Sequence, residues 1–197
     1  MTPAPSRTPR TTHRRAAIFH GYGATPAYHW FGWLAQQLEA EGISTEVPAL
    51  PQPLDPRPEQ WESCVRAALG APDAHTVAVA HSLGCLSLLR SLRSLSRGWR
   101  LGALVLVSGF TDRLPVLPEL DAFIGEGCDV SGLTERIGRI AVIRSDDDSI
   151  VPPAHTDRLA ARLGVSAQVV PGAGHFLAAE GITELPAVRD AIRASEP

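Results

Sequence analysis

The sequence predicts a single α/β domain built on a mostly parallel sheet. The chain has 197 residues, of which 44% are hydrophobic, so it can bury one sizeable core but not a second full domain. Short segments rich in aliphatic and β-branched residues recur along it, separated by stretches with the apolar spacing of helices. This alternation favours a parallel sheet with helices on both faces and right-handed crossovers.

The predicted strands are short and mainly apolar. They are expected at residues 15–20, 42–48, 75–81, 101–109, 138–145 and 166–172. In open α/β sheets, ligands bind beyond the carboxyl ends of the strands. Reactive side chains directly after a strand are therefore the candidates for a functional site.

The first predicted helix spans residues 26–41. Thr25 is the expected N-cap, Pro26 the first helical residue, and Gly42 follows the end of the helix. One face of this helix carries Trp30, Trp33, Leu34 and Leu38. Four more helices are expected at 58–69, 82–97, 153–163 and 184–194.

Composition excludes several classes of protein. The net charge is −3 and the arginines are scattered beyond the first fifteen residues, so we expect no nucleic-acid partner. The longest apolar stretch, 101–110, is far shorter than the roughly 18 residues of a membrane span. The three cysteines form no C-x-x-C pair, which indicates a cytoplasmic protein without a disulfide framework or zinc site.

The composition of the N-terminal residues and of the whole chain carries further information. Residues 1–14 are rich in Pro, Thr and Arg and lack the apolar core of a signal peptide, so we expect a disordered tail followed by a domain over 15–197. Lysine and asparagine are absent. That bias is typical of a high-GC coding sequence and suggests a bacterial protein.

Ser82 lies where the third predicted strand runs directly into a helix. In "AHSLG" its second neighbours are Ala80 and Gly84, small as a sharp strand-to-helix elbow demands. Such a turn costs backbone strain, lifts the hydroxyl into the open, and aims the N–H of Leu83 at an oxyanion on an attacked carbonyl. The alternative is that Ser82 only caps the helix.

A serine nucleophile needs a base and a carboxylate that orients it. His175 follows the last predicted strand in a loop with Gly172 and Gly174, and three aspartates follow the fifth strand in "RSDDDSIVPP". Mutual repulsion allows at most one of these aspartates to be the buried partner. The other two are expected to be solvated or to cap the helix that begins near Pro152. The chain order Ser, Asp, His is the order that this elbow architecture requires.

A glycine-containing turn follows the first strand at His20 and Gly21. It can bring a second backbone N–H, that of Tyr22, to face the one from Leu83. The simpler interpretation is a tight turn that needs glycine at positive φ, and both can hold together. We expect His20 to be structural.

These motifs resemble those of the α/β-hydrolases, and more narrowly the small serine hydrolases related to retinoblastoma-binding protein 9. The resemblance runs from about residue 16 to 192 and is carried by "HGYGATPAYHWFGWL", "VAHSLGCLSLLR", "SGFTDRLPVLPELDAFIGE", "RSDDDSIVP" and "GAGHFLAAEGITELP". It implies six parallel strands in the order 2-1-3-4-5-6 and a catalytic triad of Ser82, Asp148 and His175. Asp148 precedes the family's turn in "DSIVP", and Asp147 is the alternative acid. Ala80 replaces the first glycine of G-x-S-x-G, and its methyl group is small enough to keep the elbow.

Residues 110–135 occupy the place where larger hydrolases insert a cap, which leaves room for a minimal lid of a helix or two. We expect Tyr22, Phe110 and Leu117 to contact substrate, although core packing explains an amphipathic segment equally well. Other candidates in the lid are Leu114, Leu120 and Phe123.

The predicted function is hydrolysis of a small ester or related acyl compound through an acyl-enzyme on Ser82. Such a reaction needs no metal or organic cofactor. Thioesterase and amidase activity stay open because the same triad serves them, and the protein is expected to be a monomer or a weak homodimer. The alternative function is a catalytically weak or inactive binding or scaffold protein that keeps the fold.

Overall fold

The computed structural model describes residues 14–96 and 98–194. These residues form one six-stranded sheet in which all strands are parallel and their order is β2-β1-β3-β4-β5-β6. The predicted strand order is confirmed. The strands are β1 (Arg15–Phe19), β2 (Ser44–Glu46), β3 (Thr76–His81), β4 (Leu101–Val107), β5 (Ile137–Arg144) and β6 (Ala167–Val169).

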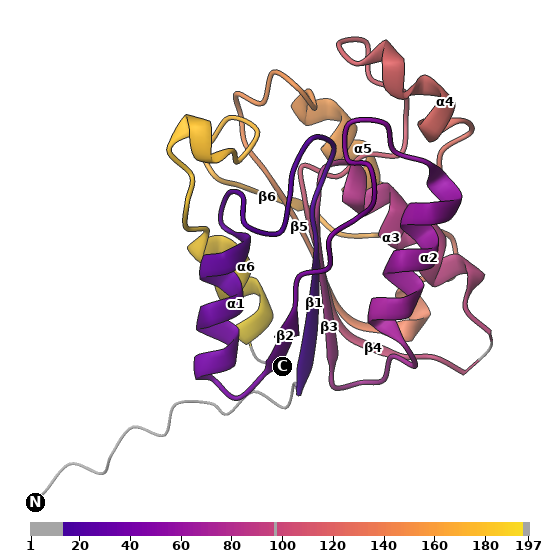
Figure 1. The fold of residues 1–197 in the computed structure, drawn as a ribbon, viewed down its shortest axis with the longest axis vertical. Coiled ribbons are helices and arrows are strands. Elements are labelled where there is room, and N and C mark those ends of the chain that lie inside the picture. The colour runs from indigo at the N-terminus through magenta and orange to yellow at the C-terminus, as the bar shows by residue number, and fades with distance from the viewer. Residues whose placement is uncertain (1–13, 97, 195–197) are drawn as a thin grey trace, which may run out of the picture.

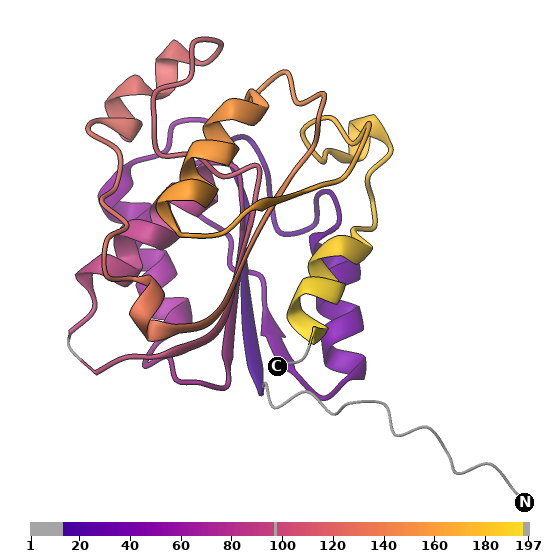
Figure 2. The same ribbon diagram turned by 180° about the vertical axis from the view of Figure 1, so that it is seen from behind.

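Helices cover both faces of the sheet, as predicted (Figures 1 and 2). The helices are α1 (Phe31–Ala40), α2 (Pro58–Leu69), α3 (Leu83–Ser94), α4 (Asp121–Ile124), α5 (Pro153–Arg162) and α6 (Pro186–Arg193). Helices α1 and α6 pack on one face, and α2, α3 and α5 pack on the other. No helix in the described part of the chain has the length and apolar character that crossing a bilayer requires.

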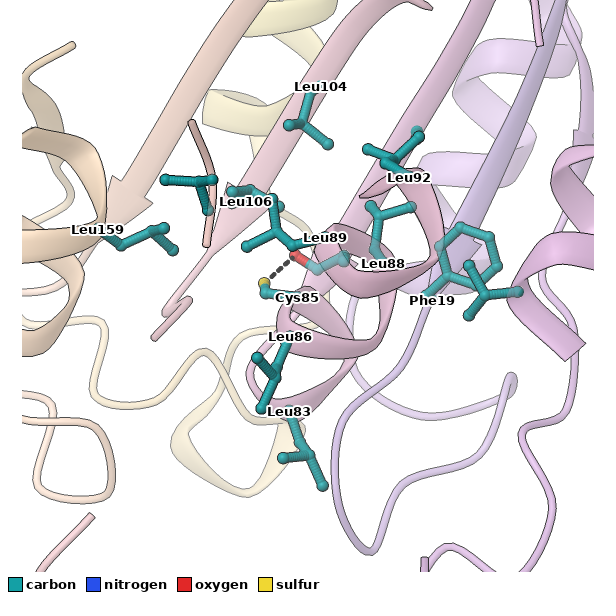
Figure 3. Close-up of a cluster of buried hydrophobic side chains, with 14 of the residues drawn as sticks. Phe19, Leu83, Cys85, Leu86, Leu88, Leu89, Leu92, Leu104, Leu106 and Leu159 are labelled. Carbon is teal, nitrogen blue, oxygen red and sulfur yellow. Dashed lines mark hydrogen bonds between the residues drawn. The ribbon is translucent and has the colours of Figure 1, made fainter. Parts of the chain in front are cut away.

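Side chains of alternate residues in the central strands point into two separate hydrophobic cores, one on each face of the sheet. On β4, Leu104 and Leu106 face α3 and α5, whereas Val105 faces α1 and α6. Figure 3 shows the first of these cores, where Leu89 of α3 lies next to Leu106 of β4. Strands buried on both faces are nearly continuous apolar runs, which is why β3 and β4 were so clear in the sequence.

The first helix begins later than predicted. Helix α1 begins at Phe31, and its N-cap is Trp30 rather than Thr25. His29 has φ +57°, a left-handed conformation that no helix continues through, and Thr25 instead accepts the N–H of Tyr28 in a separate turn. The helix ends at Ala40, one residue before the predicted end, and Gly42 follows the C-cap with φ +82°.

Other element boundaries also differ from the prediction. The edge strands β2 and β6 have three residues each, since an edge strand is paired on one side only. Helix α3 ends at Ser94 rather than 97 because Leu95 is already extended, with ψ 143°. Helix α6 begins at Pro186 rather than 184, since a residue that precedes proline is disfavoured in helical geometry.

The predicted tail of residues 1–14 falls almost wholly outside the described residues, which begin at 14. Arg14 itself is not part of a free tail. Its N–H donates to the carbonyl of His75 over 2.9 Å, so the chain pairs with the sheet one residue earlier than predicted.

Candidate active site

Ser82 forms a sharp elbow between β3 and α3. It has φ +54° and ψ −126°, and its side chain makes no capping bond to α3. The helix-cap alternative therefore has no support in the geometry, whereas the strained backbone is the one that a strand-to-helix elbow requires. The prediction of an open hydroxyl was wrong in degree, because Ser82 is only 6% exposed.

Gly84 allows the elbow to pack against the end of β1. A Cβ atom at Gly84 would lie 2.4 Å from the carbonyl oxygen of His20, so we expect Gly84→Ala to lower the free energy of unfolding by about 2 kcal/mol or more. Gly32→Ala is the matched control, because nothing lies within 4 Å of its added Cβ in helix α1. Urea unfolding of both variants checks this, and equal stabilities would contradict the packing argument.

Three side chains from three strand ends meet at one rim of the sheet. The Nε2 atom of His175 lies 3.0 Å from the Oγ of Ser82, and its Nδ1 lies 2.8 Å from the Oδ2 of Asp148. Both His175 and Asp148 are 4% exposed. With Nδ1–H donated to the carboxylate, Nε2 is free to accept the hydroxyl proton of Ser82.

Of the three aspartates after β5, Asp148 is the one that contacts His175. Its second oxygen accepts the backbone N–H groups of Ile150 (3.0 Å) and Val151 (2.8 Å). These bonds orient the carboxylate from behind, so that one oxygen remains directed at the imidazole.

Asp146 and Asp147 are exposed, but they are not merely solvated, and they do not cap α5. Asp146 accepts the N–H of Gly172 and Asp147 that of Gly174, each over 2.8 Å. Hydrogen bonds from the Ser145 hydroxyl and the Gly174 amide lower the pKa of Asp147. Both carboxylates thus hold the loop that carries His175.

Ser108 is a member of this site that the sequence analysis missed. It directly follows β4, is fully buried, and donates its hydroxyl to Oδ2 of Asp148 over 2.7 Å. Its φ is +46°, which marks a second strained turn at the same rim. The signal was its place after a strand, but the predicted strand 101–109 included it and so concealed it.

The turn after β1 lies against the nucleophile. A Cβ atom at Gly21 would lie 3.4 Å from the Ser82 Oγ, so the main chain at Gly21 passes close to the nucleophile. The N–H of Gly23 donates to the carbonyl of Pro53 over 2.9 Å and secures the turn. Leu83 is the first residue of α3, where backbone N–H groups are unpaired within the helix.

His20 is structural, as expected. Its Nδ1–H donates to the carbonyl of Gly21 over 2.9 Å, and its Nε2 accepts the N–H of Leu50 over 3.0 Å. The imidazole packs edge-on against Trp61. Both ring nitrogens are therefore occupied by main-chain groups, and His20 keeps the turn in place.

A hollow of about 200 Å³ lies between this turn, the segment before α2, and the lid segment with α4. Of the predicted substrate contacts, Tyr22 lines the hollow, whereas Phe110 and Leu117 do not. Phe110 is fully buried in the core beside α3, and Leu117 packs against the same core. The apolar lining consists of Tyr22, Leu54, Pro56, Leu120, Ala122 and Phe123, and Asp55 and Glu119 add two carboxylates.

In residues 14–96 and 98–194, no group of three or more His, Cys, Asp or Glu side chains could hold a metal ion. The thiols of Cys64, Cys85 and Cys128 are free. Burial raises the pKa of each thiol, so none is prepared to act as a thiolate.

Burial keeps several histidines around the site neutral. It lowers the pKa of His20, His29 and His81 below the usual 6.5. Below about pH 6.5 the unfolded chain therefore binds protons that the folded protein excludes, and stability falls as the pH falls.

We expect the free energy of unfolding to be nearly constant between about pH 7 and 8 and to decrease below about 6.5. The decrease should reach about 1.4 kcal/mol per pH unit for the fully buried His81 and less for the partly exposed His29. Urea unfolding at pH 7.5, 6.0 and 5.0 measures this. The His81→Phe variant should show a shallower decrease, because it lacks one of these groups. A stability that does not change across this range would contradict the assignment of neutral histidines.

Comparison with known proteins matches this chain to one protein family. The model of a family described as "Serine hydrolase" matches residues 16–194. The protein named "Putative hydrolase YdeN" of Bacillus subtilis is 39% identical over 179 residues, which are 91% of this chain and 94% of that protein. The crystal structure of that gene product superimposes with a TM-score of 0.87 and covers 92% of this chain and 97% of its own.

More distant structures share the fold. A protein from Xanthomonas campestris described as a "putative hydrolase of the alpha/beta superfamily" has a TM-score of 0.65 at 20% identity and covers 92% of this chain and 97% of its own. Est1E from Butyrivibrio proteoclasticus has a TM-score of 0.66 at 16% identity, with 96% and 89% covered. The predicted superfamily is confirmed, and the narrower likeness to retinoblastoma-binding protein 9 stays a prediction.

Proposed function

The chain belongs to the serine hydrolase family, and on that premise we propose that it hydrolyses a small ester through an acyl-enzyme on Ser82, with His175 and Asp148 completing the triad. One observation carries this proposal. The buried hydrogen-bonded series from the Ser82 Oγ through the His175 imidazole to the Asp148 carboxylate has contacts of 3.0 and 2.8 Å. These lengths lie within the range that proton transfer to a general base requires.

The proposed reaction has two steps. The Ser82 oxygen attacks the ester carbonyl while His175 Nε2 takes its proton, and the imidazolium then gives that proton to the departing alcohol. Water, deprotonated by His175, attacks the acyl-enzyme, and the proton returns to Ser82 as the carboxylic acid leaves. The backbone N–H groups of Leu83 and Tyr22 are proposed to bind the oxyanion in both steps.

The hollow beside Tyr22 is the proposed site for one side group of the substrate. A cavity of about 150 Å³ holds a benzene ring, so about 200 Å³ suits a group of roughly six to eight heavy atoms. The carboxylates of Asp55 and Glu119 disfavour anionic groups there. A neutral ester with a short acyl chain or one aromatic ring fits these properties.

A panel of p-nitrophenyl esters from acetate to decanoate, with a matched thioester and anilide, tests the proposal. We expect kcat/KM to peak at about four to six acyl carbons. Ala122→Trp should fill the hollow and move the optimum to acetate, whereas Ala71→Trp, an exposed position after α2, should not. Absence of turnover for every compound would favour the scaffold alternative, and a flat profile would contradict the assigned hollow.

A further inference from the structure

The backbone of the loop that carries His175 is left-handed on both sides of this residue, and on the Phe176 side it is strained. Gly174 has φ +53° and Phe176 has φ +61°. A bulky residue such as phenylalanine rarely adopts this conformation. Contacts elsewhere in the loop must therefore hold His175 in place.

The carboxylate of Glu180 makes one set of these contacts. Its Oε2 accepts the N–H of His175 over 2.8 Å and the N–H of Leu177 over 2.9 Å. Gly174 leaves the space for this carboxylate, since a Cβ atom there would lie 2.3 Å from Oε1. Glu180 belongs to the "GHFLAAEG" ending that also contains His175, and the proposed reaction gives Glu180 itself no role.

His81 holds the other side of the same residue. Its Nε2 lies 2.9 Å from the carbonyl oxygen of His175, and the two rings are 4.7 Å apart. A carbonyl only accepts, so Nε2 carries the proton, and Nδ1 has no hydrogen-bond partner among the described residues. Because His81 directly precedes Ser82, this bond ties the main chain of His175 to the strand that carries the nucleophile.

We propose that Glu180 and His81 are positioning residues that clamp the main chain of His175, one through its N–H and the other through its carbonyl. This inference rests on the proposed function, in which His175 is the general base. Asp148 and Ser82 bind only the ring. The clamp fixes the Cα atom from which the ring projects, and a displacement of about 1 Å in a reacting group can cost about 100-fold in rate.

Two substitutions at Glu180 test whether this residue acts as a hydrogen-bond acceptor or only through its negative charge. Glu180→Ala should lower kcat about 10- to 100-fold with KM within about twofold, because it removes both hydrogen bonds. Glu180→Gln keeps an acceptor oxygen and should restore kcat to within about fivefold of the wild type. Glu184→Ala, an exposed glutamate in the same segment, is the control and should be unchanged.

Three results would overturn the proposed role of Glu180 in the clamp. A Glu180→Ala enzyme with wild-type kcat, or a Glu180→Gln enzyme as slow as Glu180→Ala, would show that acceptance of the two N–H groups does not position the base. A raised KM with unchanged kcat would do the same, since it would indicate a role in substrate binding.

At His81, phenylalanine keeps a ring but removes the donor, and glutamine keeps an N–H donor. We expect His81→Phe to lower kcat at least about 10-fold and His81→Gln to recover part of that loss. The effects of Glu180→Ala and His81→Phe should be less than multiplicative in the double variant, because both hold one residue. Fully multiplicative losses, or equal losses for phenylalanine and glutamine, would contradict a shared clamp.

A crystal structure tests the clamp independently of any activity assay. In a crystal structure of the Glu180→Ala protein, we expect the His175 Nε2 to lie beyond hydrogen-bond distance of the Ser82 Oγ or to occupy several positions. An imidazole that stays at 3.0 Å would overturn the clamp. A wild-type protein that no fluorophosphonate labels would instead overturn the proposed function, so the two failures are distinguishable.

Discussion

Ser82→Ala is expected to lower kcat/KM for the best ester by at least about 10⁴-fold, because the variant lacks the atom that forms the acyl-enzyme. It should also lose all reaction with a fluorophosphonate probe. The residual rate would come from the oxyanion site and substrate binding alone. Ester hydrolysis and intact-protein mass after labelling measure the two effects.

The same helix supplies the control for Ser82. Ser87 is fully buried in α3, and its hydroxyl has no hydrogen-bond partner among the described residues. Ser87→Ala should keep full activity and labelling, and it should be at least as stable, since it removes an unpaired buried polar group. A Ser82→Ala protein that melts like the wild type and still labels would refute Ser82 as the nucleophile.

The elements that the sequence predicted well are those fixed by local pattern. The runs of β3 and β4 are apolar on both faces, so their burial is visible without any knowledge of partners. Ser82 directly follows β3 and His175 lies in the loop after β6, and parallel strands bring such positions to one rim. Their contact follows from topology, which the alternation of elements already limits to few possibilities.

The features that were missed depend on tertiary contacts. Thr25 and Pro26 form a good helix start, yet the turn before α1 adopts its own conformation at His29. Phe110 has the character of a pocket residue but fills the core. The hollow is lined instead by Leu54 and Pro56 from a loop that carries no periodic signal.

The aspartates after β5 also make tertiary contacts that the local sequence does not predict. Repulsion allows one buried carboxylate, but it does not say what the other two bind. In the structure Asp146 and Asp147 accept N–H groups of Gly172 and Gly174, residues that lie 26 and 27 positions away. No local sequence pattern predicts hydrogen bonds between residues so far apart in the chain.

Asp148→Asn is expected to lower kcat by about 10³- to 10⁴-fold and to leave KM nearly unchanged. An asparagine amide that donates to His175 Nδ1 stabilises the tautomer with its proton on Nε2, and that tautomer cannot accept the Ser82 proton. Steady-state kinetics with the best ester of the panel measure the change. Thermal melting establishes that the variant is folded.

Asp147→Asn is the matched control, because it stands one position away and was the alternative acid. Asparagine keeps an oxygen that can accept the Gly174 N–H, so kcat should fall by less than about 10-fold. If Asp147→Asn were the slower enzyme of the two, the acid of the triad would be wrongly assigned. Equal losses would mean that the carboxylates act together through the loop, and that the tautomer of His175 is not set by Asp148 alone.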